Sequence, residues 1–134
     1  KDPVLEDAPL SLSYGDAAQR AGGRVIDLTG WCDIDLEVDT GRCRARADTS
    51  IDTLLRVLVP RGYFLPATHG TRSVNLGGAI AADVHGKTHH GRGSFSSHVV
   101  SLVLRTADGQ RRTIGPDTYA ALYWATVIGW VSLG

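Results

Sequence analysis

Near the middle of this 134-residue chain, a run of small residues leads directly into a cluster of ionisable ones. The first part, Gly77 to Ala82, holds two adjacent glycines and one bulky side chain, Ile80. The second part, Asp83 to His90, holds one acid, three histidines and one lysine. Small residues let a backbone approach a large flat or phosphorylated ligand, and converging polar groups orient such a ligand. The junction of the two parts predicts a ligand site.

The glycine pair also closes a loop that begins at Gly70 and opens a short helix expected over 76–83. Backbone N–H groups in such a loop, together with the positive end of a helix, suit a pyrophosphate. The loop carries neither the Walker pattern nor the three-glycine dinucleotide fingerprint. A tight turn with close helix packing would explain the same glycines without any ligand.

The polar cluster contains side chains that bind zinc in other proteins, namely Asp83, His85, His89 and His90. A spacing of four would place His85 and His89 on one helical face, but Gly86 lies between them and disfavours a regular helix. No short metal signature matches the spacing. We therefore expect these groups to hydrogen-bond a ligand and expect no metal; a solvated polar loop is the alternative.

A third candidate loop lies near the N-terminus and precedes an apolar stretch over 24–28, which predicts a buried strand. It offers hydroxyl groups, an aromatic ring and a glycine, in Ser11, Ser13, Tyr14, Gly15 and Asp16. Taken alone, such a string is also typical of a simple turn.

The elements that must position these loops are short. Alternating residues on either side of 39–41 predict a hairpin over 36–47, and helical spacing predicts a helix from Thr49 or Ser50 to Leu58. The remaining elements expected are strands over 63–65, 99–105 and 111–114, a hairpin turn over 107–110, and a helix from Asp117 or Thr118 to Val127. This mixture predicts an α+β fold of mostly antiparallel strands with short helices.

The composition argues against several classes of protein. Fourteen Lys and Arg balance fourteen Asp and Glu, so nothing favours a nucleic-acid partner. No apolar run approaches the roughly 20 residues that span a bilayer, and no signal-peptide region is seen. Cys32 and Cys43 are too few for a disulfide framework, which favours a reducing compartment. We expect a cytoplasmic protein, or one bound peripherally to a membrane.

Taken together, the motifs resemble the FAD-binding domain of the vanillyl-alcohol-oxidase type, also called PCMH-type, in content and in order. The segments that carry the resemblance are 13–16, 25–28, 70–74, 77–90, 93–95, 98–99, 106–109 and 123–127. The most specific of them is the sequence from His85 to His90 after the run Gly-Gly-Ala-Ile-Ala. Within the family, the motifs are most similar to the branch that oxidises decaprenylphosphoryl-ribose for the cell-wall arabinan of actinobacteria.

The resemblance implies both the chemistry and the site. Bound FAD would accept a hydride at flavin N5 from a secondary alcohol of a sugar. The FAD contacts implied are Ser11, Ser13, Tyr14, Gly15, Asp16, Gly70, Thr71, Asn75, Leu76, Gly77 and Gly78 on the pyrophosphate side, and Ala82, Asp83, Val84 and His85 beside the isoalloxazine ring. Gly86 and Lys87 would face a lipid-linked or phosphorylated sugar, and a reductase partner would complete an epimerisation. No catalytic residue is assigned.

The chain departs from the family pattern at both ends of the resemblance. Leu12 stands where related oxidases carry the histidine that bonds covalently to FAD, which implies non-covalent FAD. Residues 8–12 and 128–134 replace glycine-rich stretches of the family. We expect residues 1–134 to be part of an FAD-binding domain, without the substrate domain. The alternatives are a flavin-dependent alditol or aldonolactone oxidase, a histidine-ligated metal hydrolase and a cofactor-free interaction domain.

Overall fold

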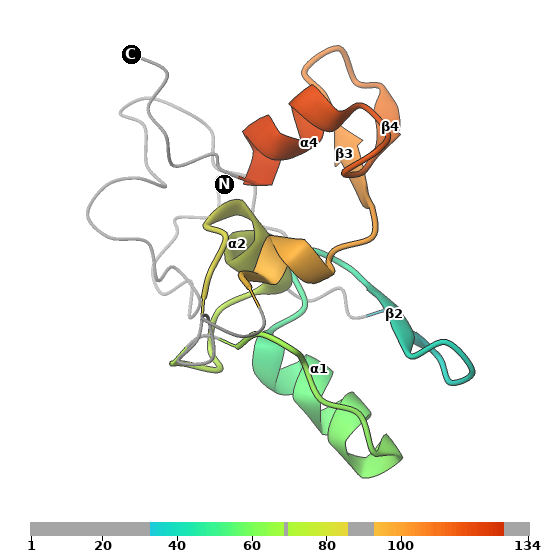
Figure 1. Cartoon of the computed structure of the whole chain (residues 1–134), viewed down its shortest axis with the longest axis vertical. Helices are drawn as coiled ribbons and strands as arrows, with labels where there is room; N and C mark the ends of the chain where they lie inside the picture. The colour runs from blue at the N-terminus through green and yellow to red at the C-terminus, as the bar shows by residue number, and fades with distance from the viewer. Residues whose placement is uncertain (1–32, 69, 86–92, 128–134) are drawn as a thin grey trace, which may run out of the picture.

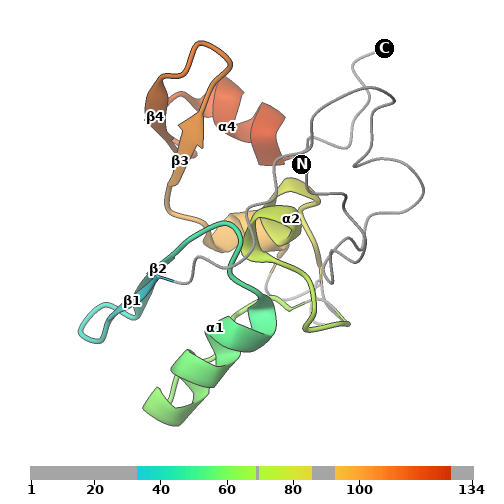
Figure 2. The same ribbon diagram turned by 180° about the vertical axis from the view of Figure 1, so that it is seen from behind.

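The computed structural model describes residues 33–68, 70–85 and 93–127, and every structural statement below refers to them. The elements are β1 (Ile34–Glu37), β2 (Arg42–Ala45), α1 (Ile51–Leu58), the 3-10 helix η1 (Val59–Arg61), α2 (Leu76–Ala81), the 3-10 helix η2 (Phe95–His98), β3 (Leu102–Arg105), β4 (Arg111–Ile114) and α4 (Ala120–Val127). Helix α2 lies between α1 at one end and α4 with the β3–β4 hairpin at the other (Figure 1). The view from behind shows the same order (Figure 2). Two antiparallel hairpins and short helices confirm the predicted α+β fold.

The first hairpin forms around the predicted reversal, but it covers 34–45 where 36–47 was expected. Strand β1 pairs with β2 so that Ile34 lies opposite Ala45 and Glu37 lies opposite Arg42. Gly41 has a φ of 68°, a left-handed conformation that glycine adopts without steric cost. The predicted reversal is therefore confirmed.

Helix α1 begins and ends with local signals. The Ser50 hydroxyl oxygen accepts the N–H of Thr53 at 3.0 Å, as an N-cap residue does. At the other end, α1 continues directly into η1, whose C-cap residue Gly62 has a φ of 81°, and the Tyr63 N–H donates back to the Leu58 carbonyl at 3.1 Å. These contacts close the last turn in the manner of a glycine C-cap.

The strand expected over 63–65 is wrong. The backbone N–H of Tyr63 is used to close α1, and its hydroxyl donates to the Val38 carbonyl at 2.6 Å. The segment therefore packs its ring against the first hairpin and is paired with no strand among the described residues.

The second hairpin also forms as expected, with Leu102 opposite Ile114. In its turn, the Asp108 carboxylate accepts the N–H of Gln110 at 3.1 Å, and Gly109 has a φ of 79°. The strand expected over 99–105 begins only at Leu102, because the Val99 N–H donates to a carbonyl of η2 and completes that turn.

Helix α4 starts later than expected. The cap was predicted at Asp117 or Thr118, but Thr118 forms a β-bridge with Gly115, and the helix starts at Ala120. Tyr119, with a φ of 52°, turns the chain into the helix, and its carbonyl accepts the first helical N–H, from Tyr123. The bridge therefore delays the helix by about half a turn.

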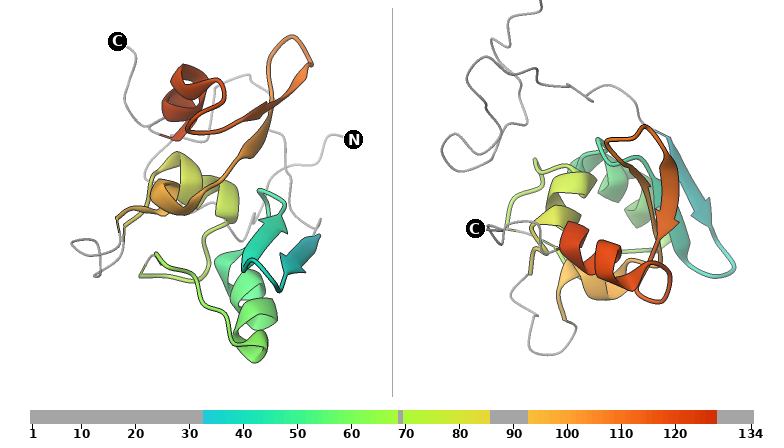
Figure 3. Two further views of the ribbon diagram at one scale, coloured as in Figure 1. Left: turned by 45° about the vertical axis from the view of Figure 1, so that its right-hand side comes forward. Right: turned by 90° about the horizontal axis from the view of Figure 1, so that it is seen from above.

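One apolar cluster joins the elements. Its buried members come from α1, α2, η2, β4, α4 and the loop after η1, and they are Ile51, Ala67, Ala79, Ile80, Phe95, Ile114, Tyr123 and Val127. Ile114, Tyr123 and Val127 are completely buried. Figure 3 shows α2 and η2 side by side within this arrangement. No helix in the described ranges is long and apolar enough to cross a membrane.

Candidate functional site

The loop that begins at Gly70 runs against the first turn of α1. The N–H of Ile51 donates to the Val74 carbonyl at 2.9 Å, and the N–H of Asp52 donates to the Arg72 carbonyl at 3.0 Å. Such first-turn N–H groups have no partner within their own helix. The loop and the helix therefore satisfy each other, which holds the loop in an extended course beside α1.

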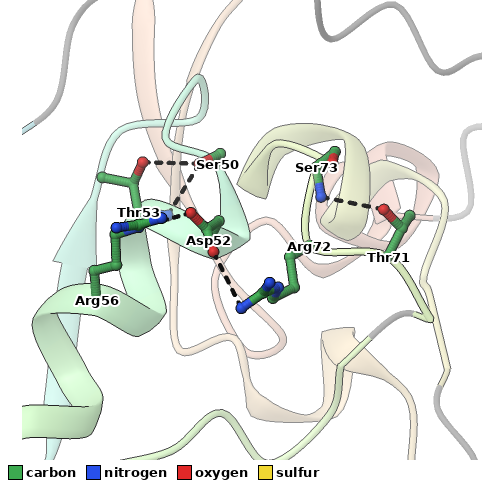
Figure 4. Close-up of polar contacts among 7 residues, drawn as sticks. All are labelled: Ser50, Asp52, Thr53, Arg56, Thr71, Arg72 and Ser73. Atoms are coloured by element: carbon green, nitrogen blue, oxygen red, sulfur yellow. Dashed lines mark hydrogen bonds and ion pairs between the residues drawn. The ribbon is translucent and has the colours of Figure 1, made fainter.

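Side chains strengthen the same junction. Figure 4 shows the Asp52 carboxylate between the guanidinium groups of Arg56 and Arg72, at 2.8 Å and 3.5 Å. The hydrogen bond from Arg56 and the charges of both arginines lower the pKa of the Asp52 carboxyl group below its ordinary value. Both arginine side chains are largely exposed, so these ion pairs contribute little to stability. The Arg72 pair joins the loop to α1, whereas the Arg56 pair lies within the helix. Within the loop, the Thr71 hydroxyl accepts the N–H of Ser73 at 3.2 Å.

The first three N–H groups of α2 all donate to other groups of the protein. The N–H of Leu76 donates to the Thr49 carbonyl at 2.8 Å, and the N–H of Gly77 donates to the Ala47 carbonyl at 2.7 Å. Gly78 donates to the Asn75 side-chain oxygen at 2.7 Å, which makes Asn75 the N-cap. The N–H groups of the glycine pair are therefore occupied by the protein itself.

Close packing explains why both of these positions are glycine. A Cβ added at Gly77 would lie 3.0 Å from the Ala47 Cβ and 3.1 Å from the Ala47 carbonyl oxygen. A Cβ added at Gly78 would lie 2.9 Å from the Asn75 side-chain oxygen. The packing explanation thus accounts for the glycine pair without a ligand. The part of the loop that offers N–H groups lies just before it.

Three residues of that part carry the open N–H groups. Within the described residues, the backbone N–H groups of Arg72, Val74 and Asn75 make no hydrogen bond. The side chain of Arg72 is 76% exposed. The loop before α2 therefore presents backbone donors and one accessible cation.

The other end of α2 is tied to η2. The helix ends at Ala81, and Asp83 has a φ of 41°. The Asp83 Oδ1 atom accepts the N–H of Ser96 at 3.0 Å, and the Val84 carbonyl accepts the next N–H upstream, from Phe95, at 2.9 Å. The Asp83 side chain is thus directed toward η2, whereas Ala82 and His85 are exposed.

The surroundings of Asp83 favour its ionised form. Partial burial raises the pKa of its carboxyl group, but hydrogen bonds from Ser96 and Ser94 and the nearby His85 outweigh this and lower the pKa below its ordinary value. Ser96 is also held from its other side, because the Tyr123 hydroxyl donates to the Ser96 carbonyl at 3.0 Å. Burial, followed by the charge of Asp83, raises the pKa of Tyr123.

The structure divides the predicted site residues into two groups at opposite ends of one helix. Gly70, Thr71, Asn75, Leu76, Gly77 and Gly78 lie on the loop and the first turn of α2, and Ala82, Asp83, Val84 and His85 lie at its far end. A six-residue helix is about 9 Å long, so α2 sets the spacing between the groups. The other predicted site residues lie outside the described residues: Ser11, Ser13, Tyr14, Gly15, Asp16, Gly86 and Lys87.

Sequence reasoning missed the residues that hold these two groups in place. Arg72 reaches Asp52 from 20 positions away, and Ser96 reaches Asp83 from 13 positions away. Neither pair has a sequence spacing that a helix or hairpin pattern would indicate. Tyr123 was placed on the final helix, but nothing in its spacing indicated a bond to Ser96. No group of three or more potential metal ligands gathers in the described ranges, which do not include His89 and His90.

The chain is similar to known flavoproteins. Residues 10–115 match the family model described as an FAD binding domain. The chain is 45% identical to "Decaprenylphosphoryl-beta-D-ribose oxidase" of Mycolicibacterium smegmatis, over 90% of this chain and 26% of that protein. It is 29% identical to "FAD-linked oxidoreductase penO" of Penicillium crustosum, over 75% of this chain and 22% of that protein.

The chain spans about a quarter of the length of these relatives. The family match nevertheless covers most of the chain itself and includes the loop before α2. The chain therefore belongs to the PCMH-type family of FAD-binding domains.

Proposed function

We propose that this domain serves an enzyme that oxidises a secondary alcohol of a lipid-linked ribose, of the decaprenylphosphoryl-ribose type. The observation that carries the proposal is the 45% identity with an oxidase of that substrate, which extends over 90% of this chain. The FAD-linked oxidoreductase relative from Penicillium is 29% identical over a shorter stretch. The keto sugar formed would be consumed by a reductase partner, in a step of cell-wall arabinan synthesis. The enzyme would work in the cytoplasm or at a membrane surface.

The loop before α2 would bind the FAD pyrophosphate. The open N–H groups of Arg72, Val74 and Asn75 are donors of the kind that bind phosphate oxygens. Gly70 and Thr71 would contribute the start of this surface, and Leu76, Gly77 and Gly78 would contribute close approach. The loop of Ser11, Ser13, Tyr14, Gly15 and Asp16 would complete the binding site.

The far end of α2 would meet the isoalloxazine ring. Ala82 and His85 are exposed there, and Asp83 and Val84 fix the backbone between them. When bound, FAD would supply the hydride acceptor. The protein would orient ring and sugar for the transfer, with Gly86 and Lys87 on the sugar side, where a lysine can bind a phosphate or hydroxyl group.

We infer that FAD is held without a covalent bond, because Leu12 has no nucleophilic atom to offer the flavin. Acid precipitation of the full-length protein should release all of its flavin into the supernatant. Yellow colour in a washed pellet would contradict this.

The substrate is tested by anaerobic reduction of the flavin in the full-length protein. A polyprenylphosphoryl-ribose should bleach the flavin band, whereas alditols and aldonolactones at the same concentration should not. Replacement of Lys87 by Ala should slow reduction and leave the flavin spectrum intact, whereas His85→Ala should change the spectrum. Bleaching by an alditol or an aldonolactone, and not by the lipid-linked sugar, would refute the substrate and favour the alternative oxidases.

A further inference from the structure

We propose that Asp83 is a positioning residue: its carboxylate fastens the end of α2 to η2 and thereby fixes the backbone that leads into His85. The inference rests on the proposed function, because it takes His85 as a flavin contact. Asp83 acts through the protein and not on the flavin, since its Oδ1 atom accepts the N–H of Ser96 at 3.0 Å.

Two hydrogen bonds form the fastening, which we call the Asp83 clasp. The first joins the Asp83 carboxylate to the Ser96 N–H, and the second joins the Val84 carbonyl to the Phe95 N–H at 2.9 Å. The bonds link adjacent residues on each side. Two adjacent bonds restrict rotation as well as distance, so the segment before His85 has little freedom relative to η2.

The backbone at Asp83 shows that the surroundings impose this geometry. Its φ of 41° lies in the left-handed region, which residues other than glycine rarely adopt, although Asp and Asn tolerate it best. The N–H of Asp83 donates to the Ile80 carbonyl at 3.0 Å, and that of Val84 donates to the Ala79 carbonyl at 3.1 Å. The turn therefore folds back onto α2 and brings the carboxylate to Ser96.

The donor end of the clasp, at Ser96, is itself held in place by other residues. Ser96 is buried, and its carbonyl accepts the hydroxyl of the completely buried Tyr123 at 3.0 Å. Asp83 thus binds the N–H of Ser96 while α4 binds its C=O. This connection ties the turn before His85 to the core and not to a mobile surface group.

Three substitutions distinguish the effect of the hydrogen bond at Asp83 from the effects of its backbone conformation and of its charge. Asp83→Asn keeps an oxygen acceptor and tolerates the left-handed φ, but removes the charge. Asp83→Gly also suits the left-handed φ, yet has no acceptor. Asp108→Gly is the matched control, because Asp108 likewise accepts a backbone N–H, from Gln110, but lies in the turn of the β3–β4 hairpin.

The experiment is FAD titration of the full-length protein, with the visible absorbance and circular dichroism of the bound flavin as readouts. Loss of the hydrogen-bond acceptor predicts that Asp83→Gly raises the FAD dissociation constant about tenfold and shifts the flavin bands. Asp83→Asn and Asp108→Gly should remain within about threefold of the wild type and keep its spectrum. Rescue by Asn identifies the acceptor, and not the charge, as the cause.

The contrary outcomes are distinct. A wild-type dissociation constant and spectrum for Asp83→Gly would overturn the clasp alone, as would an Asn variant as impaired as the Gly variant. Wild-type protein that binds no FAD would overturn the proposed function and the clasp with it. If Asp83→Gly fails to fold, Tyr123→Phe is the second test. Loss of the hydroxyl that holds the Ser96 carbonyl to α4 should shift the same bands in the same direction, and an unshifted spectrum would refute the role.

Discussion

The glycine pair at the start of α2 allows a prediction in which two neighbouring substitutions have different effects. Gly77→Ala places a methyl group 3.0 Å from the Ala47 Cβ and 3.1 Å from the Ala47 carbonyl oxygen. That carbonyl is backbone and already accepts the Gly77 N–H at 2.7 Å, so it cannot move away without loss of the bond. Overpacking of this kind costs about 1–3 kcal/mol, and the helix-forming advantage of Ala over Gly recovers about 0.5–1 kcal/mol.

Gly78→Ala meets a neighbour that can yield. The new methyl group would lie 2.9 Å from the Asn75 side-chain oxygen, and rotation of that side chain sacrifices the N-cap, worth about 1 kcal/mol. The helix-forming advantage of Ala offsets most of this loss. We therefore expect Gly77→Ala to destabilise the protein by about 1–2 kcal/mol more than Gly78→Ala does.

Thermal unfolding of the full-length protein, freed of flavin, measures the difference. Gly77→Ala should lower the unfolding temperature by several degrees, whereas Gly78→Ala should change it little. Gly70→Ala is the control, because nothing lies within 4 Å of its added Cβ. An unchanged unfolding temperature for Gly77→Ala, or an equal fall for both glycine variants, would refute the reasoning from the Ala47 carbonyl.

Further changes test other parts of the fold by the same unfolding measurement. Asn75→Ala should cost about 1 kcal/mol by loss of the N-cap, and Asn75→Ser should restore most of it. Tyr123→Phe should cost about 1 kcal/mol because the Ser96 carbonyl loses the hydroxyl donor and keeps only the Val99 N–H. Ile114→Ala, at a completely buried position, should cost about 2–5 kcal/mol. Because the folded protein lowers the pKa of Asp83, its carboxylate stabilises the fold above about pH 4 and ceases to do so as the pH falls through the lowered pKa; Asp83→Asn should remove that part of the pH dependence.

The elements that the sequence predicts well are those with local causes. Helix α1 follows from the Ser50 cap and from apolar residues at helical spacing, and the second hairpin follows from Asp108 and Gly109 in its turn. Helix α2 begins directly after Asn75, whose side chain caps it by the same local rule. In each case, the deciding contact joins residues at most four positions apart.

The features that the sequence could not predict depend on distant residues. The run Tyr63 to Leu65 has the composition of a strand, but its N–H and hydroxyl groups are used by α1 and the first hairpin. At Gly77 the need for glycine arises from Ala47, thirty positions earlier. The glycine pair accordingly suggested a phosphate-binding surface, whereas the open N–H groups lie on the residues just before it.

The two hydrogen bonds from the first turn of α1 to the loop have a consequence for hydrogen exchange. The amide protons of Ile51 and Asp52 exchange with solvent only when the loop carbonyls of Val74 and Arg72 move away. A ligand that holds the loop in place slows that opening in proportion to its occupancy. The exchange rates of these two amides therefore measure how often the loop leaves α1, and deuterium labelling can follow them without a flavin signal.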